Sequence, residues 1–148
     1  MIRLLVALFA AGLLLSACGS QSMSAAMKSW AHQSSYSYAS TNKQLITDAT
    51  HSAKALRTKG ETNDQLHLVC GVLDYDTESA NSFLPTPDKA ASKLLDSAYG
   101  NLGAGATICY KAGHSATTRA RALSYLSKGV GQLNEAYARI KSDTSSVN

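Results

Sequence analysis

The sequence predicts an all-α protein: a four-helix antiparallel bundle tied by one disulfide. Apolar residues recur at intervals of three and four along several segments, the period of a helix with one buried face. Helix-capping residues, glycines and prolines border these segments, and no segment has a convincing strand pattern. Because the connections between the segments are short, consecutive helices are expected to pack antiparallel.

The chain begins with the features of a secretory signal. Arg3 gives a short, positively charged start, residues 4–15 form a nearly unbroken apolar run, and small residues follow it. The run is too short to cross a hydrocarbon core of ~30 Å comfortably as a helix. The alternatives are an ordinary cleaved signal and an uncleaved N-terminal anchor.

The stretch Leu15-Ser16-Ala17-Cys18 follows this run directly and resembles a bacterial lipobox. The resemblance implies that residues 1–17 are a lipoprotein signal peptide and that Cys18 becomes the acylated first residue of the mature chain. Residues 18–22 would then form a lipidated tether, and residues 23–148 the helical domain. Stable anchoring requires more than one acyl chain, since each buried methylene contributes about 0.8 kcal/mol.

The first part of the domain predicts two helices. A short helix is expected around Trp30, followed by a weak or broken region over residues 34–41, where Ser, Thr and Tyr are middling helix formers. A longer helix is expected over residues 39–58, ending before Lys59-Gly60. Its apolar stripe consists of Leu45, Ala49, Ala53 and Leu56.

Two further helices flank the Leu84-Pro85 turn. Thr62 and Gln65 have the spacing of a capping box, so a helix should begin there and end over residues 81–83. The next helix is expected over residues 87–111, with Thr86 as its N-cap and Pro87 in its first turn.

The last helix has the clearest periodicity. It is expected over residues 116–141, after Gly113 as a stop signal and Ser115 as an N-cap. Its apolar stripe consists of Leu123, Leu126, Val130, Leu133, Tyr137 and Ile140. Two glycines inside it cost up to ~1 kcal/mol each in helix propensity.

The three cysteines divide into one anchor and one pair. With Cys18 used for lipidation, Cys70 and Cys109 remain, and an exported protein can oxidise them to a disulfide. Such a bridge closes a loop of roughly 40 residues and contributes about 3–4 kcal/mol. Two buried free thiols and a redox pair are the alternatives, and the absence of Cys-x-x-Cys disfavours the redox pair.

The charge pattern argues against a nucleic-acid partner. The chain has 14 Lys and Arg against 10 Asp and Glu, a net charge of +4, and no clustered basic patch is visible in the sequence. Residues 61–88 are acidic, whereas residues 119–141 are mostly basic. The two stretches predict one acidic and one basic solvated face; alternatively, the basic face lies against anionic lipid headgroups or envelope polymers.

The candidate binding residues are glycines and aromatic residues. Gly100, Gly103 and Gly105 interrupt the helix over residues 87–111. They favour close approach of a neighbouring helix, against a bulky Tyr or Trp, or else a small groove for a ligand or partner helix. Trp30, Tyr36 and Tyr38 could form a sugar- or protein-binding patch, Tyr36 and Tyr38 being expected to be exposed, or they could be core residues.

No catalytic, metal or cofactor site is predicted. The four histidines lack the four-residue spacing of a metal pair. Asp74 and Glu78 share a helix face but need a pocket to act as an acid–base pair, so a solvated face is expected. Calcium would require a ligand-dense loop with a turn glycine.

Taken together, Cys18, Trp30, Cys70, the linker Leu84-Pro85-Thr86-Pro87-Asp88 and Cys109 resemble small lipoproteins of Actinobacteria. The resemblance covers most of the mature chain and implies a surface-exposed, disulfide-tied helical bundle. It carries over no catalytic residues.

The expected function follows from this address. The protein is predicted to be a non-enzymatic lipoprotein, anchored in the bilayer through Cys18 on the extracytoplasmic face of the cell membrane. It would bind an envelope protein, a wall polymer or a phage component. One alternative is a small-ligand carrier with an apolar inter-helix groove, and another is a phage- or prophage-encoded superinfection-exclusion lipoprotein. A carrier predicts an apolar interior cavity of roughly 300 Å³ or more, whereas a partner-binding protein predicts a filled core and an exposed apolar patch.

Overall fold

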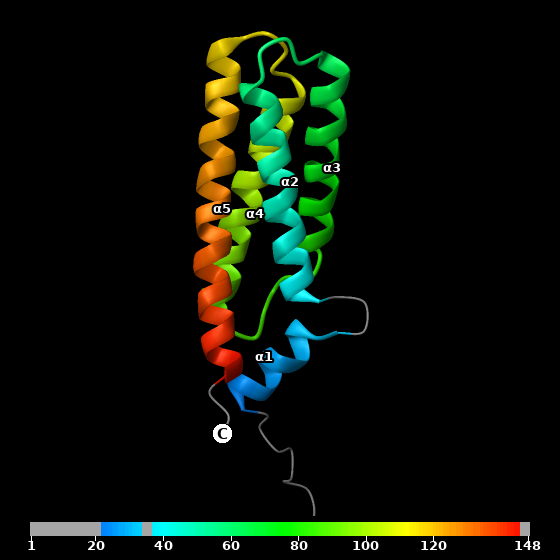
Figure 1. The fold of residues 1–148 in the computed structure, drawn as a ribbon. Helices are drawn as coiled ribbons and strands as arrows, with labels where there is room; N and C mark the ends of the chain where they lie inside the picture. The colour runs from blue at the N-terminus through cyan, green and yellow to red at the C-terminus, as the bar shows by residue number, and fades with distance from the viewer. Residues whose placement is uncertain (1–21, 34–36, 146–148) are drawn as a thin grey trace, which may run out of the picture.

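The computed structural model describes residues 22–33 and 37–145, and all their regular elements are helices. Four long helices lie side by side and run alternately up and down: α2 (Tyr38–Arg57), α3 (Asn63–Asn81), α4 (Lys89–Tyr110) and α5 (Ala116–Ser145) (Figure 1). A short helix, α1 (Met23–Ala31), packs against α5 at one end. The all-α prediction is confirmed: the described residues form the four long helices and α1, which matches the short helix expected around Trp30.

The helix boundaries follow local capping chemistry. The predicted capping box is present, since Thr62 Oγ1 accepts a hydrogen bond from Gln65 N and Gln65 Oε1 accepts one from Thr62 N. The predicted start of α4 is wrong by two residues: Asp88, not Thr86, is the N-cap. Its carboxylate accepts hydrogen bonds from Ala90 N and Ala91 N, which satisfies two amides of the first turn. At the other end of the chain, α5 continues past the predicted residue 141 to Ser145.

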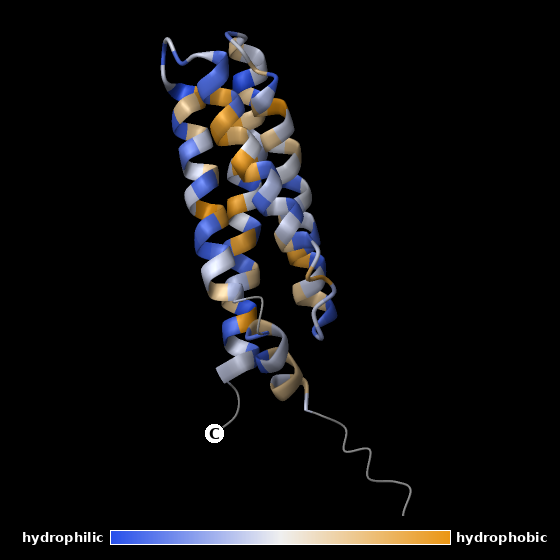
Figure 2. Ribbon diagram, turned by 90° about the vertical axis from the view of Figure 1, so that its right-hand side faces the viewer, coloured by the Kyte–Doolittle hydropathy of each residue, from blue (hydrophilic) through white to orange (hydrophobic). Residues whose placement is uncertain are grey.

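The core lies on the inner faces of the four long helices. Each of them packs against two neighbours around a ring, in the order α2, α3, α4, α5 and back to α2. Hydrophobic and hydrophilic residues alternate along each helix (Figure 2), which is the pattern of an amphipathic helix with one buried stripe. Leucines fill the centre; those with at most 2 % of their surface exposed are Leu45, Leu66, Leu73, Leu95, Leu102, Leu126 and Leu133.

Two glycines let α4 and α5 approach closely. A Cβ atom at Gly105 would lie 2.6 Å from Leu126 Cδ2, and one at Gly129 would lie 2.7 Å from Leu102 Cγ. Each glycine therefore receives a leucine of the opposite helix. The contact between α4 and α5 depends on these two positions having no side chain.

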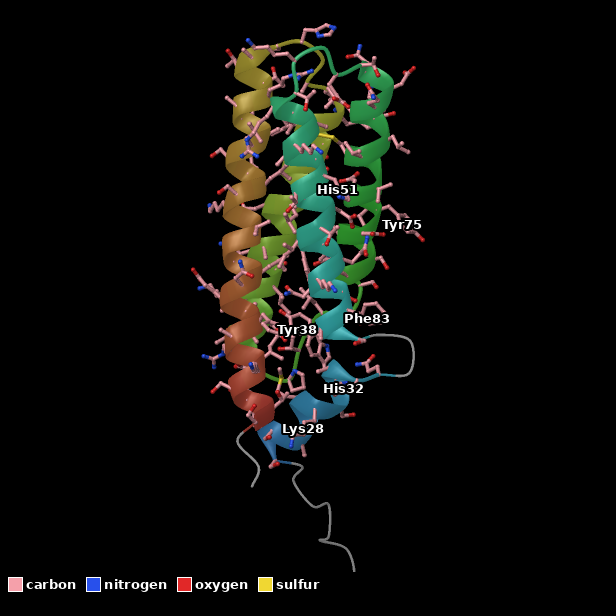
Figure 3. The ribbon with its side chains drawn as sticks, in the orientation of Figure 1. Lys28, His32, Tyr38, His51, Tyr75 and Phe83 are labelled. Atoms are coloured by element: carbon pink, nitrogen blue, oxygen red, sulfur yellow. A yellow bond between two sulfur atoms is a disulfide. The ribbon has the colours of Figure 1, made fainter. Side chains whose placement is uncertain are left out.

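The predicted disulfide is present. Cys70 on α3 and Cys109 on α4 are bonded, with their Cα atoms 5.9 Å apart, and both are fully buried. The bridge joins residues 39 positions apart in the sequence. It fixes α3 to α4 in the half of the molecule farther from α1 (Figure 3).

Candidate functional site

Two of the aromatic residues considered as a binding patch are core residues. Trp30 and Tyr38 are 5 % and 2 % exposed, so the expectation that Tyr38 is exposed is wrong. Trp30 Nε1 donates a hydrogen bond to Phe83 O at 2.9 Å, and its ring lies 5.4 Å from that of Tyr38. Tyr38 also stacks on Tyr137, at 6.1 Å between ring centroids. These contacts dock α1 onto the long helices (Figure 3). Tyr36 lies outside the described residues.

Burial also changes the acidity of Tyr38. Its pKa is raised, first by desolvation of the phenol and then by the neighbouring hydroxyls of Tyr99 and Tyr137. The phenol therefore stays neutral throughout the physiological range. Its ring packs against those of Trp30 and Tyr137.

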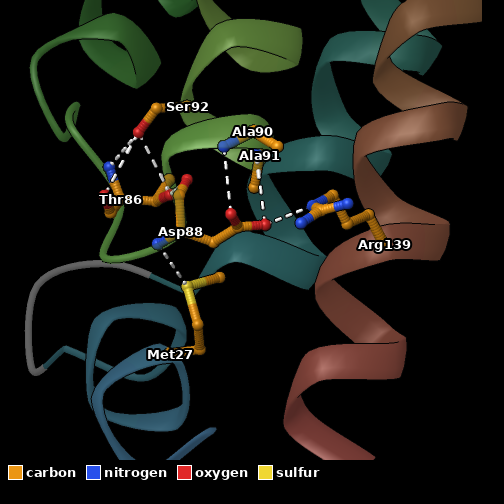
Figure 4. Close-up of polar contacts among 7 residues, drawn as sticks. All are labelled: Met27, Thr86, Asp88, Ala90, Ala91, Ser92 and Arg139. Atoms are coloured by element: carbon orange, nitrogen blue, oxygen red, sulfur yellow. Dashed lines mark hydrogen bonds and ion pairs between the residues drawn. The ribbon is translucent and has the colours of Figure 1, made fainter. Parts of the chain in front are cut away.

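A polar network closes the same end of the molecule (Figure 4). Besides capping α4, Asp88 forms an ion pair with Arg139 of α5, and its backbone N–H donates to Met27 Sδ of α1 at 3.4 Å. The Arg139 hydrogen bond is the main reason that the pKa of Asp88 is lowered to about 2. Thr86 N donates to Ser92 Oγ at 2.6 Å and braces the turn. This cluster ties three helices together, which is a structural role.

The three candidate glycines of α4 have different surroundings. Gly105 fits the predicted close approach of a neighbouring helix, but the partner is Leu126 rather than a tyrosine or tryptophan. Gly100 faces open space, and Gly103 lies 3.9 Å (measured from an added Cβ) from Thr77 Cγ2. Gly100 and Gly103 line a hollow of about 310 Å³ between α3 and α4. Of these three glycines, only Gly105 has a close contact that requires a residue without a side chain, so packing accounts for its low helix propensity at that position alone.

Several hollows indent the surface of the described residues. Four of them, of about 310, 360, 420 and 630 Å³, open to solvent at the surface. The largest is lined by residues around Pro85 and Pro87 together with Lys89 and Lys93. Between the long helices, the leucines of the core are buried against one another.

One carboxyl pair, Asp48 and Asp76, was not predicted from the sequence. Asp48 of α2 is 6 % exposed and accepts two hydrogen bonds from Gln44 Nε2, at 3.0 and 3.1 Å. Burial raises its pKa, and so does a hydrogen bond shared with Asp76 of α3. The position of Asp48, three residues after Leu45 in a helical stripe, was the available signal. In the part of the chain that the structure describes, no group of three or more His, Cys, Asp or Glu residues could hold a metal ion.

The feature that stands out is an apolar stripe on the outer face of α3. Leu68, Val72 and Tyr75 are 68 %, 43 % and 73 % exposed, and their spacing of four and three residues puts them on one helix face. Tyr75 projects away from the molecule (Figure 3). Gly71 lies within this stripe, and nothing lies within 4 Å of where its Cβ would be. We call these four residues the α3 stripe.

Carboxylates accompany the α3 stripe. The helix carries Asp64, Asp74, Asp76 and Glu78 but no lysine or arginine. Asp64 and Glu78 are exposed, whereas Asp74 and Asp76 are half-buried. The surface of α3 thus combines an apolar centre with negative charge at both ends, a combination that single scattered surface leucines do not produce.

Comparison with protein-family models, curated proteins and solved structures found no match to this chain. Among residues 22–33 and 37–145, no helix is both long and apolar enough to cross a membrane. The described residues define a disulfide-tied helical domain with an exposed apolar stripe on α3, and the function is inferred from that geometry.

Proposed function

We propose that the protein is a lipoprotein anchored on the extracytoplasmic face of the cell membrane, and that it acts by binding another envelope protein rather than by catalysis. The anchor rests on Leu15-Ser16-Ala17-Cys18, which lies outside the described residues. The chain enters α1 at Met23, five residues after Cys18, so the end that carries α1 would stand next to the bilayer. On this proposal, residues 1–17 are removed, and α2–α5 form a four-helix antiparallel bundle extended by α1.

The observation that carries the binding proposal is the α3 stripe. Inner leucines of the same helix, Leu66 and Leu73, are fully buried, so the helix already has its core face. The exposed residues Leu68, Val72 and Tyr75 form a second apolar face that contributes nothing to that core. An exposed apolar stripe beside polar residues is typical of a protein-binding surface.

The charges of α3 define the chemistry of the partner. Because the helix carries four carboxylates and no cation, a complementary surface has an apolar centre bordered by Lys or Arg. Such complementarity speeds association and rejects acidic competitors. Gly71 leaves room for the partner's backbone to approach α3 closely. We therefore commit to a protein surface with an apolar centre and a basic rim.

Site-specific crosslinking in cells tests the proposal. A photoreactive amino acid replaces Val72 in the α3 stripe, and the same group at exposed Ser127 of α5 is the matched control. We expect a discrete adduct at position 72 only, whose crosslinked peptide is apolar and bordered by Lys or Arg. Leu68→Asn should abolish this adduct, whereas Met23→Ser, which alters an apolar residue outside the stripe, should not.

Three outcomes would reject the proposal. Equal adducts at both positions would mean that the surface is not selective, and no adduct would mean that it has no partner. An adduct with a second copy of this chain alone would make the α3 stripe a self-association interface. The anchor is tested separately, because Cys18→Ser should release the protein from the membrane fraction without altering its helical fold.

A further inference from the structure

The fold gathers cations that are far apart in the sequence. The end opposite α1 is built from the C-terminus of α2, the two connections α2–α3 and α4–α5, and the first turns of α5 (Figure 1). We call it the distal basic surface; its cations are Lys54, Arg57, Lys59, Lys111, Arg119 and Arg121. Only Glu61 and Asp64 bring negative charge to the same end. Six cations against two carboxylates leave +4, which equals the net charge of the whole chain. The remainder balances only with Arg3 counted; on the proposal that residues 1–17 are removed, it carries seven cations against eight carboxylates.

These cations are not neutralised within the fold. In the described residues, the one contact close enough for an ion pair is Arg139 with Asp88, at the other end of the molecule. Arg119 alone has a structural role, since its Nη1 donates to Leu56 O and Thr58 O, each at 3.1 Å, and its Nε donates to Gly113 O at 2.6 Å. Arg119 thereby links the end of α2 to the α4–α5 connection. Arg57, Lys59, Lys111 and Arg121 are exposed to solvent.

A hollow of about 420 Å³ makes part of this surface concave. Arg57, Lys59, His114 and Arg119 line it; the other lining residues are Leu56, Thr58, Gly60, Ala116, Ala120 and Leu123. A concave surface lined by one sign of charge concentrates ions of the opposite sign. The hollow is open to solvent, so a polymer can lie across it as well as a single group.

We propose that the distal basic surface binds an anionic polymer of the cell envelope, with phosphodiester or similar phosphate groups as the recognised chemistry. This goes beyond the proposed protein partner of the α3 stripe, and it uses the proposed anchor only to place the surface. With 20 residues, α2 alone is about 30 Å long. The distal basic surface therefore lies farther from the anchored end than the Debye length of ~10 Å, beyond which salt screens the attraction between charges. A polymer between the membrane and the exterior is within its reach, whereas the headgroups of its own bilayer are not.

The test compares two triple variants that remove equal charge from opposite ends. Arg57→Gln/Lys59→Gln/Arg121→Gln alters the distal basic surface and leaves Arg119 in place. Lys28→Gln/Lys89→Gln/Lys141→Gln is the control at the α1 end, where all three side chains are likewise exposed. Full-length protein extracted in neutral detergent is titrated with long-chain polyphosphate, with inorganic phosphate and with vesicles containing phosphatidylglycerol, at several salt concentrations.

We expect polyphosphate to bind the natural protein with a Kd that rises steeply with salt. The distal triple variant should weaken this binding roughly 100-fold at low salt, as expected for the loss of three cations near a charged surface. The control triple variant should change it less than about threefold. Inorganic phosphate should bind far more weakly than the polymer, because it engages one contact at a time. Unchanged helical circular dichroism of both variants makes the comparison valid.

Equal weakening by both triple variants would overturn the proposal, because it would mean that net charge alone attracts the polymer. Absence of polyphosphate binding at low salt would also overturn it. Tighter binding to the vesicles than to polyphosphate would assign the surface to membrane headgroups instead. None of these outcomes depends on acylation of Cys18 or on a partner at the α3 stripe, so this proposal and the proposed function fail separately.

Discussion

Four of the five glycines on α4 and α5 allow a sharp test of how these helices pack. Gly105 and Gly129 each face a leucine of the opposite helix, whereas Gly100 and Gly131 have nothing within 4 Å of an added Cβ. Glycine to alanine at all four positions makes the same chemical change within the same two helices. The four variants therefore separate the cost of crowding from the gain in helix propensity.

The added methyl group has two effects of opposite sign on the free energy of unfolding. Alanine in place of an exposed helical glycine stabilises a helix by about 0.8–1 kcal/mol. At Gly129, however, the new methyl group would meet Leu102 Cγ at 2.7 Å and Ala98 O, a backbone atom, at 3.1 Å. Overpacking of this kind costs about 1–3 kcal/mol. We expect Gly105→Ala and Gly129→Ala to be less stable than Gly100→Ala and Gly131→Ala by roughly that cost.

Urea unfolding followed by circular dichroism at 222 nm measures this difference. Gly100→Ala and Gly131→Ala should shift the midpoint upward, and the other two variants should fall below them by about 1–3 kcal/mol in the free energy of unfolding. Equal stability of all four variants would refute the close approach of α4 and α5 described above.

Three further predictions concern other contacts. Replacing Cys70 and Cys109 together by alanine should lower the free energy of unfolding by about 4 kcal/mol, because the bridge no longer restricts the unfolded chain; urea unfolding measures it. Because the pKa of Asp88 is lowered to about 2, ionised Asp88 contributes about 2 kcal/mol to the free energy of unfolding above its unfolded pKa, and this contribution is lost as pH falls toward 2. The pKa of Asp48 is raised, so its contribution to stability falls as pH rises above the ordinary aspartate range. Thermal unfolding measured against pH should lose the first effect in Asp88→Asn and the second in Asp48→Asn. Trp30→Phe removes one indole hydrogen bond and should cost about 1 kcal/mol, with faster amide exchange confined to α1.

Each of these predictions has a contradicting result. A fully reduced natural protein as stable as the oxidised one would mean that the disulfide contributes nothing. Acid sensitivity unchanged in Asp88→Asn would assign the titration to another carboxyl group. Uniformly faster exchange in Trp30→Phe would mean that α1 is part of one cooperative unit rather than a docked element.

Local signals in the sequence were enough to predict most helix boundaries. The capping box at Thr62 predicted the start of α3, and Ser115 as an N-cap after Gly113 predicted the start of α5. The start of α4 was misassigned because Thr86 and Asp88 are both good cap residues on either side of Pro87. What decides between them is the fold: Asp88 is held by Arg139, which lies 51 residues away.

Features that depend on packing could not be predicted in the same way. Tyr38 lies in a polar stretch of the sequence, and only the folded chain brings Trp30 and Tyr137 against it. The distal basic surface is assembled from two distant stretches, residues 54–59 and 111–121, so the sequence shows only a diffuse excess of cations. The α3 stripe, by contrast, has a signal in the sequence: Leu68, Val72 and Tyr75 form a second apolar pattern beside the core residues of the same helix.

The measurement that tests the account most directly is the intact mass of the N-terminal peptide from membrane-purified protein. The account predicts a peptide that begins at Cys18 and is heavier than its sequence by a diacylglyceryl group, with or without an N-acyl chain. A peptide that begins elsewhere, or one that contains Cys18 with its thiol unmodified, would contradict it.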